Sequence, residues 1–351
     1  MMENLIRDWN GETVITRYDR PSGAWIFIAI YSTHLGPAGG GTRMKTYPDA
    51  ASALRDAQRL AEGMTYKLAL SGMNFGGGKA VIAAPEDLAP DSRPDLLRRY
   101  GKLIRQLGGL FYTGPDIGTS ATDMNLIAEA GAPYVFGRTA SAGGAGSSGP
   151  ATALGVFAGM QVASELIFGA RSLKDRRVLV QGAGSVGGAL IDYLQSAGAE
   201  VIFSDVEEGA VCRFRDGLGL QCVPAEEVYH LDCDIFAPCA GGQVLNAQTI
   251  SQLKCRVVAG SANNQLAEPE DAQRLKERGI LYAPDYVINF GGAMFLVGME
   301  TQGWTRKKAE KMLTDGVQDA LSQIFELALT RDITTESAAR QVAEQRLSRN
   351  S

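Results

Sequence analysis

The sequence predicts an α/β protein of two domains, an N-terminal α/β domain and a C-terminal domain with a doubly wound parallel sheet. Its 351 residues exceed the length of a typical single domain. Strand-like and helix-like patterns alternate along both halves, as in α/β folds. Between the halves, the small-residue stretch SAGGAGSSGP at Ser141–Pro150 is typical of a hinge between domains.

The first half alternates apolar strand patterns, glycine-rich turns and helical patterns. WIFIAIYS has the composition and alternation of a strand, and the helices show apolar residues at spacings of three and four. In chain order, we expect a strand at 25–32, a turn at 36–43, a helix at 49–62, a strand at 65–70, a glycine loop at 76–78, a strand at 80–84, a helix at 93–107, a strand at 111–113 and a turn at 114–116.

The second half repeats a shorter rhythm. Pro150 suits the first turn of a helix that runs to about Phe168. Short apolar strands then recur with helices or turns between them, the pattern of a doubly wound parallel sheet. We expect these strands at 178–180, 201–203, 235–237, 257–259 and 280–282, and a mostly helical segment at 306–346 with a break near 332–335.

Composition narrows the class of protein. Hydrophobic residues make up 45% and charged residues 21%, the balance of an ordinary globular enzyme. A net charge of -5 argues against nucleic acid as a partner, since such proteins are usually basic. Met1–Trp9 lacks the apolar core of a signal peptide, and the uncharged stretch between Arg138 and Glu165 is too rich in small residues for a membrane span. We therefore expect a cytoplasmic protein without a membrane partner.

Cysteine and histidine are scarce. The five cysteines form no CxxC pair, which favours reduced, packing cysteines over disulfides or zinc. With only His34 and His230 present, a histidine triad or a histidine-rich metal site is not expected. Acid–base chemistry must then depend on lysine, aspartate, glutamate or tyrosine.

One glycine-rich turn has the context of a dinucleotide site. It follows the strand VLVQ, opens a helix and comprises Gly182, Gly184, Ser185, Val186 and Gly187. Its glycines allow a tight turn, a close approach of pyrophosphate and close helix packing. Asp205, 23 residues past the first glycine, would accept the ribose hydroxyls, and two glutamates just after it disfavour a 2′-phosphate. The sequence therefore predicts NAD as cofactor. A second GxGxxG at 144–149 lacks the preceding strand and the acid, so we assign it to the hinge.

Two lysines and an aspartate carry the strongest chemical signal in the first half. Lys67 in GMTYKLAL and Lys79 in FGGGKAV lie twelve residues apart on apolar segments, and Asp116 follows TGP. Burial lowers a lysine pKa and can make the side chain a base near neutral pH. A lysine can instead bind a carboxylate as a fixed cation. The alternative is that both lysines extend to solvent from strand ends.

Eight motifs connect the chain to a known family. In order they are LGPAGGGTR, GMTYKLA, GGGKAVI, TGPDIGT, VQGAGSVGG, FAPCA, AGSANNQ and ILYAPDYVINFGGA. Over residues 10–345 they resemble the glutamate/leucine/phenylalanine/valine dehydrogenase family, and phenylalanine dehydrogenases most. The resemblance implies reversible, metal-free, NAD-dependent oxidative deamination of an L-amino acid to a 2-oxo acid and ammonium by a homo-oligomer. It also implies a substrate domain at 1–146, with a helix at 327–351 packing back on it, and a Rossmann NAD-binding domain at 147–326.

The resemblance assigns roles to matching positions. Lys67 would bind the substrate α-carboxylate, Lys79 would be the general base that activates water, and Asp116 would transfer protons at the amino group. Contacts with the substrate through the backbone are implied at Gly40, Gly41 and Asn263. Contacts with the cofactor are implied at Thr152, Cys239, Ala240 and Asn263.

The substrate side chain is expected to be apolar. Neither GPAGGGT nor NFGGAMFLVG contains a cation that could meet a second carboxylate. Pocket lining, with ordinary core packing as the equal alternative, is expected for Gly40, Ile117, Phe290, Ala293, Met294 and Val297. Phe290 replaces the alanine usual in the family's NAGG motif, and its ring would narrow the pocket, reorient the substrate or point away. Phenylalanine is our first substrate prediction, with tryptophan, leucine or valine as alternatives.

Two other classes of function fit part of the sequence. A catalytically silent NAD-binding sensor would explain the second half but has no need of Lys67, Lys79 and Asp116. A Rossmann enzyme acting on a folate or a hydroxy acid leaves the two glycine-flanked lysines unexplained.

Overall fold

The computed structural model describes residues 2–348, which divide into two units. The first unit comprises the chain up to Ser148, Phe295–Arg306 and the chain from Ala343. The second comprises Gly149–Met294 and Lys307–Val342. Residues 307–342 thus group with the second unit and the chain from Ala343 with the first, while the packing that we expected for residues 327–351 stays a prediction.

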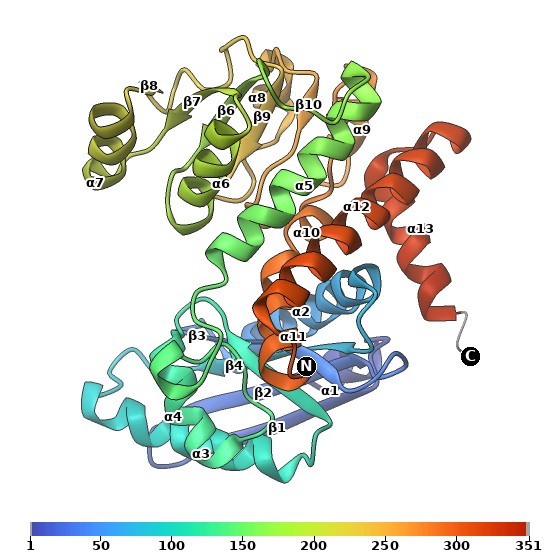
Figure 1. The fold of residues 1–351 in the computed structure, drawn as a ribbon. Coiled ribbons are helices and arrows are strands. Elements are labelled where there is room, and N and C mark those ends of the chain that lie inside the picture. The colour runs from blue at the N-terminus through green and yellow to red at the C-terminus, as the bar shows by residue number, and fades with distance from the viewer. Residues whose placement is uncertain (1, 349–351) are drawn as a thin grey trace. The chain divides into compact units, whose positions relative to one another are not determined.

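The first unit is built on a mixed sheet of five strands (Figure 1). Its strands are β1 (Thr13–Asp19), β2 (Ala24–Ser32), β3 (Ala38–Lys45), β4 (Gly76–Ala83) and β5 (Phe111–Pro115), in the order β1-β2-β4-β3-β5. Its helices before residue 148 are α1 (Met2–Arg7), α2 (Ala50–Ser71), α3 (Arg93–Gln106) and α4 (Ala121–Gly131). Strands β4, β3 and β5 run parallel, while β1 and β2 are antiparallel to their neighbours.

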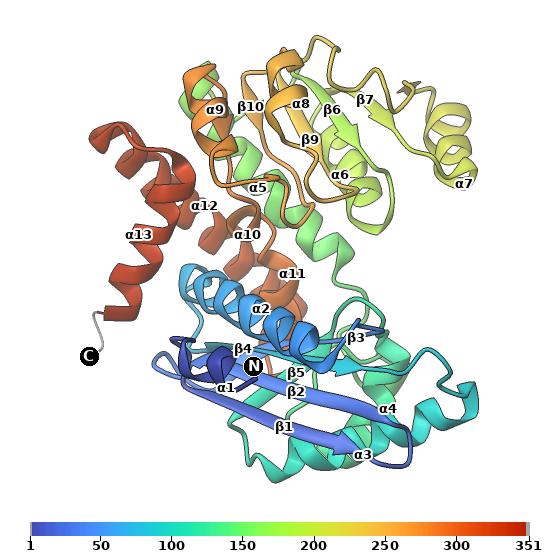
Figure 2. The ribbon, with the colours of Figure 1, turned by 180° about the vertical axis from the view of Figure 1, so that it is seen from behind.

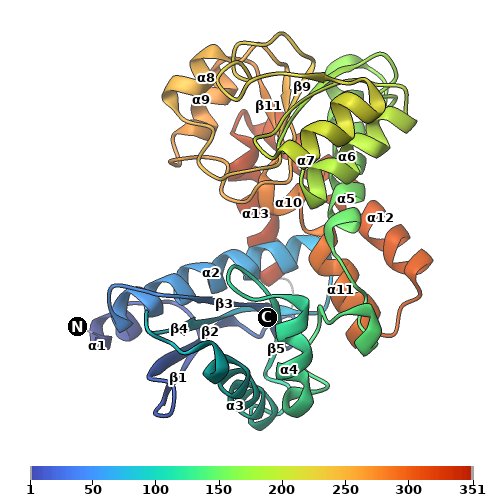
Figure 3. The same cartoon turned by 90° about the vertical axis from the view of Figure 1, so that its left-hand side faces the viewer.

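Helices cover both faces of this sheet (Figure 3). Helix α2 buries Leu54, Ala57 and Ala61 against Phe27 and Val81 on one face. Helices α3 and α4 close the other face over a larger apolar cluster that includes Ile28, Ile82, Tyr100 and Phe111. Because side chains alternate along a strand, odd positions of β4 around Lys79 and Val81 face α2, and even positions such as Ile82 face α3 and α4.

Helix α2 is longer than the sequence predicted. The segment expected as a strand at 65–70 is instead the last part of α2, so Lys67 lies on a helix. The helix ends at Gly72, which adopts the left-handed conformation (φ 71°) and donates its N–H to the carbonyl of Ala69. The threonine and tyrosine of TYKLAL favour strands locally, but packing of α2 on the sheet overrides that preference.

The two glycine runs of this unit lie within strands and are not the turn and loop that we predicted. Residues 38–45 form β3 and residues 76–78 begin β4. The glycines are required by close packing: a Cβ on Gly77 would lie 2.2 Å from the backbone nitrogen of Thr65 in α2. A Cβ on Gly40 would lie 1.8 Å from the carbonyl oxygen of Gly78. The absence of side chains therefore brings α2, β3 and β4 close together.

The second unit confirms the expected doubly wound sheet (Figure 1). Its strands are β6 (Arg177–Gln181), β7 (Glu200–Ser204), β8 (Gln221–Cys222), β9 (Ile235–Pro238), β10 (Val257–Val258) and β11 (Leu281–Tyr282). All are parallel, in the order β11-β10-β9-β6-β7-β8. The chain reverses its direction of winding between β6 and β9, the switch point at which such folds bind ligands. The short β8 was not predicted.

The helices of the second half have the following bounds. They are α5 (Gly149–Phe168), α6 (Ser185–Ser196), α7 (Glu208–Val211), α8 (Ala247–Gln252), α9 (Asp271–Glu277), α10 (Asp285–Ile288), α11 (Gly291–Thr301), α12 (Arg306–Arg331) and α13 (Thr335–Ser348). Helices α8 and α9 lie beside β9 and β10 (Figure 2) and pack through Ile250 and Leu275. The expected break at 332–335 separates α12 from α13.

Helix α5 is long and apolar enough, by composition alone, to cross a membrane. However, 56% of its most apolar window is buried inside the structure. Its N-terminus packs closely, because a Cβ on Gly149 would lie 2.1 Å from Ser185 Oγ. This is the burial of a core helix, not of a helix that presents an apolar surface to lipid.

Candidate active site

Lys79 and Asp116 form a buried ion pair in the first unit. Lys79 Nζ lies 2.7 Å from Asp116 Oδ1, and the lysine side chain is only 6% exposed. Lys79 projects from β4, and Asp116 follows the last residue of β5. Two of the three residues singled out by the sequence are therefore in direct contact.

Gly41 on β3 leaves the space in front of this pair open. A Cβ at this position would lie 2.9 Å from Asp116 Cβ and 3.3 Å from Lys79 Nζ. Its backbone therefore lies close to both charged groups. Gly40 points to the opposite face of the sheet and is buried there, so its lack of a side chain reflects strand packing.

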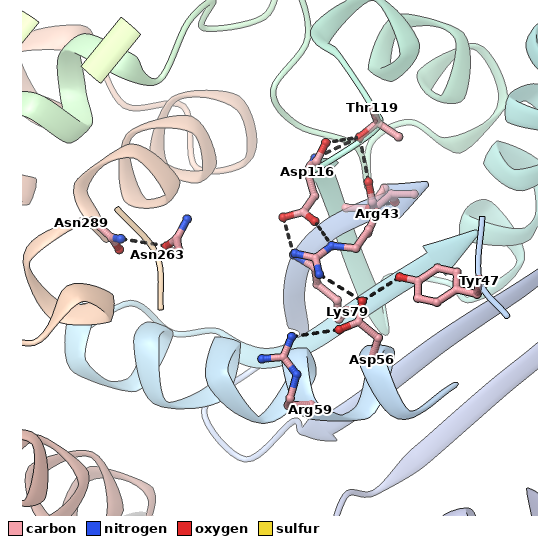
Figure 4. A network of polar contacts seen from close by, with 11 residues as sticks. Arg43, Tyr47, Asp56, Arg59, Lys79, Asp116, Thr119, Asn263 and Asn289 are labelled. Carbon is pink, nitrogen blue, oxygen red and sulfur yellow. Dashed lines mark hydrogen bonds and ion pairs between the residues drawn. The ribbon is translucent and has the colours of Figure 1, made fainter. Parts of the chain in front are cut away.

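An arginine and a second aspartate extend the ion pair into a network (Figure 4). Arg43 Nε donates to Asp116 Oδ2 at 2.8 Å, and its Nη1 donates to Asp56 Oδ2 at 3.0 Å. Asp56, on α2, also accepts hydrogen bonds from Tyr47 Oη at 2.7 Å and Arg59 Nη2 at 2.9 Å. Sequence reasoning missed these groups, although Arg43 lies within the GPAGGGTR motif.

The network shifts the pKa of both members of the central pair. Burial is the largest influence on Lys79 and lowers its pKa, an effect that the Asp116 carboxylate opposes and the Arg43 charge reinforces. Burial alone would raise the pKa of Asp116. The Lys79 ammonium and the Arg43 guanidinium outweigh it and hold the pKa of Asp116 below its usual range. The geometry therefore supplies a lysine that releases its proton more readily than a free one, beside a carboxylate that stays ionised.

Lys67 occupies a different element from the other two. It lies on α2, 11 residues after Asp56, and three helical turns place both residues on one stripe of the helix. Its side chain is half-buried. The structure thus does not support the alternative that the two lysines extend from strand ends.

A recess of about 420 Å³ lies within the first unit, and its wall includes Pro115, the residue that precedes Asp116. It is lined by Pro115, Ala121, Gly137, Thr139, Ala140, Gly146, Ser147, Ser148 and Leu296. None of these nine residues carries a charge, and most are small. The recess is therefore suited to an apolar group, although none of its lining residues was among the site residues that we predicted.

Glu300 fixes one wall of this recess. Its carboxylate accepts the backbone N–H groups of Gly137 and Ala145, each at 2.9 Å, and is 2% exposed. The Arg138 side chain lies 3.2 Å from the same carboxylate. Residues 137–145 are consequently held in place, although the hinge expected at 141–150 stays a prediction.

The residues expected to line the side-chain pocket have mixed environments. Ile117 is 62% exposed, whereas Phe290, Met294 and Val297 are almost fully buried. Ala293 is partly exposed. The ring of Phe290 has no accessible surface, which favours the last of its three options, that it points away from a ligand.

The glycine turn of the second unit has the shape that a dinucleotide requires. Gly182 adopts φ 93°, and a Cβ there would lie 2.6 Å from Ala240 Cβ. A Cβ on Gly187 would lie 1.8 Å from the carbonyl oxygen of Gly182. Gly184 differs, because no protein atom lies within 4 Å of a Cβ built there and the residue is exposed. Two glycines thus serve the turn, while the third leaves room for a phosphate at the start of α6.

The other predicted cofactor residues gather around this turn at the carboxyl edge of the sheet. Asp205 follows β7, and its Oδ2 accepts the N–H of Ala183 at 2.5 Å. Cys239 and Ala240 follow β9, and Cys239 donates its N–H to the carbonyl of Gln181 at 2.7 Å. Thr152 lies in the first turn of α5, whose Gly149 packs against Ser185 at the start of α6.

Asn263 lies on an exposed loop after β10, where its side chain accepts a hydrogen bond from Asn289 Nδ2 at 2.8 Å (Figure 4). The following residue, Asn264, has φ 52°, a left-handed conformation that is uncommon outside glycine. Asn289 Oδ1 is buried without a hydrogen-bond partner among the described residues. Asn289 was not predicted, although it lies in the motif that contains Phe290.

Comparison with known proteins decides the family. The model of the Glu/Leu/Phe/Val dehydrogenase dimerisation domain matches residues 20–132. The model of the glutamate/leucine/phenylalanine/valine dehydrogenase family matches residues 143–223 and 204–351. The chain belongs to this amino-acid dehydrogenase family. The predicted resemblance and the two-domain α/β fold are thereby confirmed.

Relatives with three different names align over nearly the whole dehydrogenase. Leucine dehydrogenase of Geobacillus stearothermophilus is 43% identical over 96% of this chain and 90% of the relative. Phenylalanine dehydrogenase of Lysinibacillus sphaericus is 38% identical over 94% of this chain and 87% of the relative. The crystal structure of L-tryptophan dehydrogenase from Nostoc punctiforme superposes with a TM-score of 0.87 at 38% identity, covering 100% of this chain and 99% of that one. Identity alone does not separate the three apolar substrates.

Proposed function

We propose that this dehydrogenase catalyses the reversible, NAD-dependent oxidative deamination of an apolar L-amino acid to its 2-oxo acid and ammonium. The observation that carries the proposal is the buried Lys79–Asp116 pair, whose members lie 2.7 Å apart beside an uncharged recess. A base of lowered pKa next to an ionised carboxylate provides both proton transfers that deamination needs.

Each polar group has one task in the proposed reaction. Lys67 binds the substrate α-carboxylate as a fixed cation, with the backbone of Gly41 beside it. Asp116 accepts a proton from the substrate amino group. A nicotinamide cofactor held at the Gly182–Gly187 turn would supply the hydride acceptor for the substrate Cα, and the imino acid is the form of the substrate on which the next residues act. Lys79 then removes a proton from the water that attacks this imino carbon, and Asp116 returns a proton to the departing nitrogen.

The substrate side chain is assigned to the recess beside Asp116. Since none of its lining residues is charged, a glutamate side chain would lose its hydration there without gaining a counter-ion. Small residues such as Gly137 and Gly146 leave space for an aromatic ring. Phenylalanine therefore stays our first prediction, with leucine, valine and tryptophan as alternatives. Discrimination among them is expected to be modest, because each methylene changes binding by only about 1–3 kcal/mol.

The family membership makes the enzyme NAD(P)-dependent, and we assign NAD. Asp205 supports this assignment, because its carboxylate is tied to the glycine turn through Ala183 and would repel a 2′-phosphate. We further assign the chain to a homo-oligomer, which is supported by the dimerisation-domain match at residues 20–132, and we expect it in the cytoplasm.

Asp205→Ala should lower the preference for NAD over NADP, expressed as the ratio of kcat/KM values, by about 10–100-fold. The change removes hydrogen bonds that the ribose hydroxyls would donate to the charged carboxylate, each worth about 1.5–3 kcal/mol. The ratio is obtained by following the absorbance of the reduced cofactor with NAD and with NADP in turn. Asp232→Ala, an exposed carboxylate of the same unit, is the control. An unchanged ratio in Asp205→Ala would remove the NAD assignment.

The reaction itself is tested by its products. Each apolar L-amino acid is incubated with NAD, and the 2-oxo acid, ammonium and NADH are quantified separately. The proposal predicts equal amounts of all three. Tight NAD binding without any product from any amino acid would instead support a silent sensor.

A further inference from the structure

The Lys79–Asp116 pair is held by charged groups that no assigned role covers. The Arg43 side chain is 12% exposed and that of Asp56 is 15% exposed, so both contribute to the site largely out of water. Arg43 is the only residue in Figure 4 that touches both aspartates. We propose that Arg43, balanced by Asp56, is a positioning residue that orients the Asp116 carboxylate and sets the protonation of Lys79. This inference rests on the proposed function, in which Lys79 must lose a proton before it can activate water.

The hydrogen bonds divide the two carboxylate oxygens of Asp116 between two cations. Oδ1 is bound to Lys79 and Oδ2 to Arg43 Nε. The backbone of Asp116 is held as well, because its N–H donates to Thr119 Oγ1 at 3.0 Å and that hydroxyl donates to the carbonyl of Thr42 at 2.7 Å. Rotation of the carboxylate would break at least one charge-assisted bond. Arg43 therefore keeps Oδ1 directed at Lys79.

The second contact of Arg43 ties this arrangement to α2. Its Nη1 donates to Asp56, whose carboxylate also accepts hydrogen bonds from Tyr47 and Arg59. The planar guanidinium donates to one carboxylate through Nε and to another through Nη1, which fixes their relative orientation. A lysine has a single ammonium group and could not reproduce this geometry. Asp56 thus holds the Arg43 side chain in position, and Arg43 in turn holds the Asp116 carboxylate.

The charges in the network also control the proton on Lys79. The charged members are the cations Arg43, Arg59 and Lys79 and the anions Asp56 and Asp116, and the neutral phenol of Tyr47 completes the set. Lys67, farther along α2, is the remaining charged residue assigned to the site. With Lys79 protonated the five charges sum to +1, and with Lys79 neutral they cancel. Arg43 lowers the pKa of Lys79 and Asp56 raises it, after the larger effects of burial and Asp116. The two residues therefore act in opposite directions on one proton.

The opposite signs give the test. The rate rises with pH as Lys79 loses its proton, so the rising limb of the kcat–pH profile follows the Lys79 pKa. Arg43→Gln should move this limb to higher pH by about one unit, and Asp56→Asn should move it to lower pH by a similar amount. Arg43→Lys keeps the charge but loses the two-way contact. It should leave the limb near its original pH while lowering kcat about tenfold or more. Arg55→Gln, which removes an exposed cation next to Asp56 on α2, should change neither quantity.

A second readout does not depend on turnover. Lysine carrying ¹³C at Cε is incorporated during expression for NMR, which labels buried lysines as well, and the Lys79 signal is identified by its loss in Lys79→Arg. Its titration midpoint should rise in Arg43→Gln and fall in Asp56→Asn. Shifts in the same direction in both variants, or none in either, would overturn the inference while leaving the proposed function intact. Failure of the unmodified enzyme to release any 2-oxo acid would overturn the proposed function instead. Circular dichroism of each variant checks that it is folded. Arg43→Lys, which keeps the charge at this position, shows whether a change at Arg43 is tolerated by the fold.

Discussion

Lys79→Ala lowers kcat by about 10²–10⁴-fold, the usual contribution of a positioned general base. The Lys79 ammonium group is in direct contact with Asp116, and its side chain is buried on β4, where bulk buffer has little access to replace it. NAD binding should be nearly unchanged, because the glycine turn lies in the other unit. Both quantities are measured on one preparation, kcat by NADH formation and NAD affinity by calorimetric titration.

Lys102→Ala is the matched control for this prediction. Lys102 lies on α3 of the same unit and is exposed, so its removal tests the loss of a lysine without the loss of the base. Turnover in Lys79→Ala close to that of the control would contradict the role of Lys79. A parallel loss of NAD affinity would show that the change had damaged the fold.

Asp116→Asn also lowers kcat by about 10²–10⁴-fold, for a different reason. Asparagine has nearly the same shape but cannot accept and return a proton. It also leaves Lys79 and Arg43 facing each other without the carboxylate that now lies 2.7 Å from one and 2.8 Å from the other. The pKa of Lys79 should fall further, because the group that opposes the effect of burial is lost. The rising limb of the remaining activity should therefore move to lower pH.

The two effects of Asp116→Asn are separated by measuring kcat across the pH range. Raising the pH should not restore the rate, since the base is already neutral and the proton carrier is absent. Asp95→Asn, which removes an exposed carboxylate on α3, should behave like the unmodified enzyme. Recovery of full turnover at high pH would argue that Asp116 only tunes Lys79 and transfers no proton.

The sequence predicted best those features that depend on neighbours along the chain. The turn at Gly182 and the acid at Asp205 belong to one strand–turn–helix–strand unit, so their spacing alone predicts their placement. The long-range contacts were not predictable in this way. Arg43 and Asp56 meet only because β3 and α2 pack together, and nothing in their separation of 13 residues indicates it.

Local preference also misled where packing decides the structure. TYKLAL has residues that favour a strand, yet it completes α2, because Gly77 lets the helix approach the sheet at Thr65. The glycines of β3 and β4 suggested turns, but they permit close contact between neighbouring backbones. Glu300 lies far along the chain from the loop that it holds, so its part in the recess could be found only from the fold.

The most direct test of this account is a panel of the twenty L-amino acids with NAD, in which kcat/KM is measured for each by NADH formation. An uncharged recess beside the Lys79–Asp116 pair predicts the highest values for phenylalanine, leucine, valine or tryptophan and almost none for glutamate and aspartate. A preference for glutamate, or no turnover with any amino acid, would contradict it.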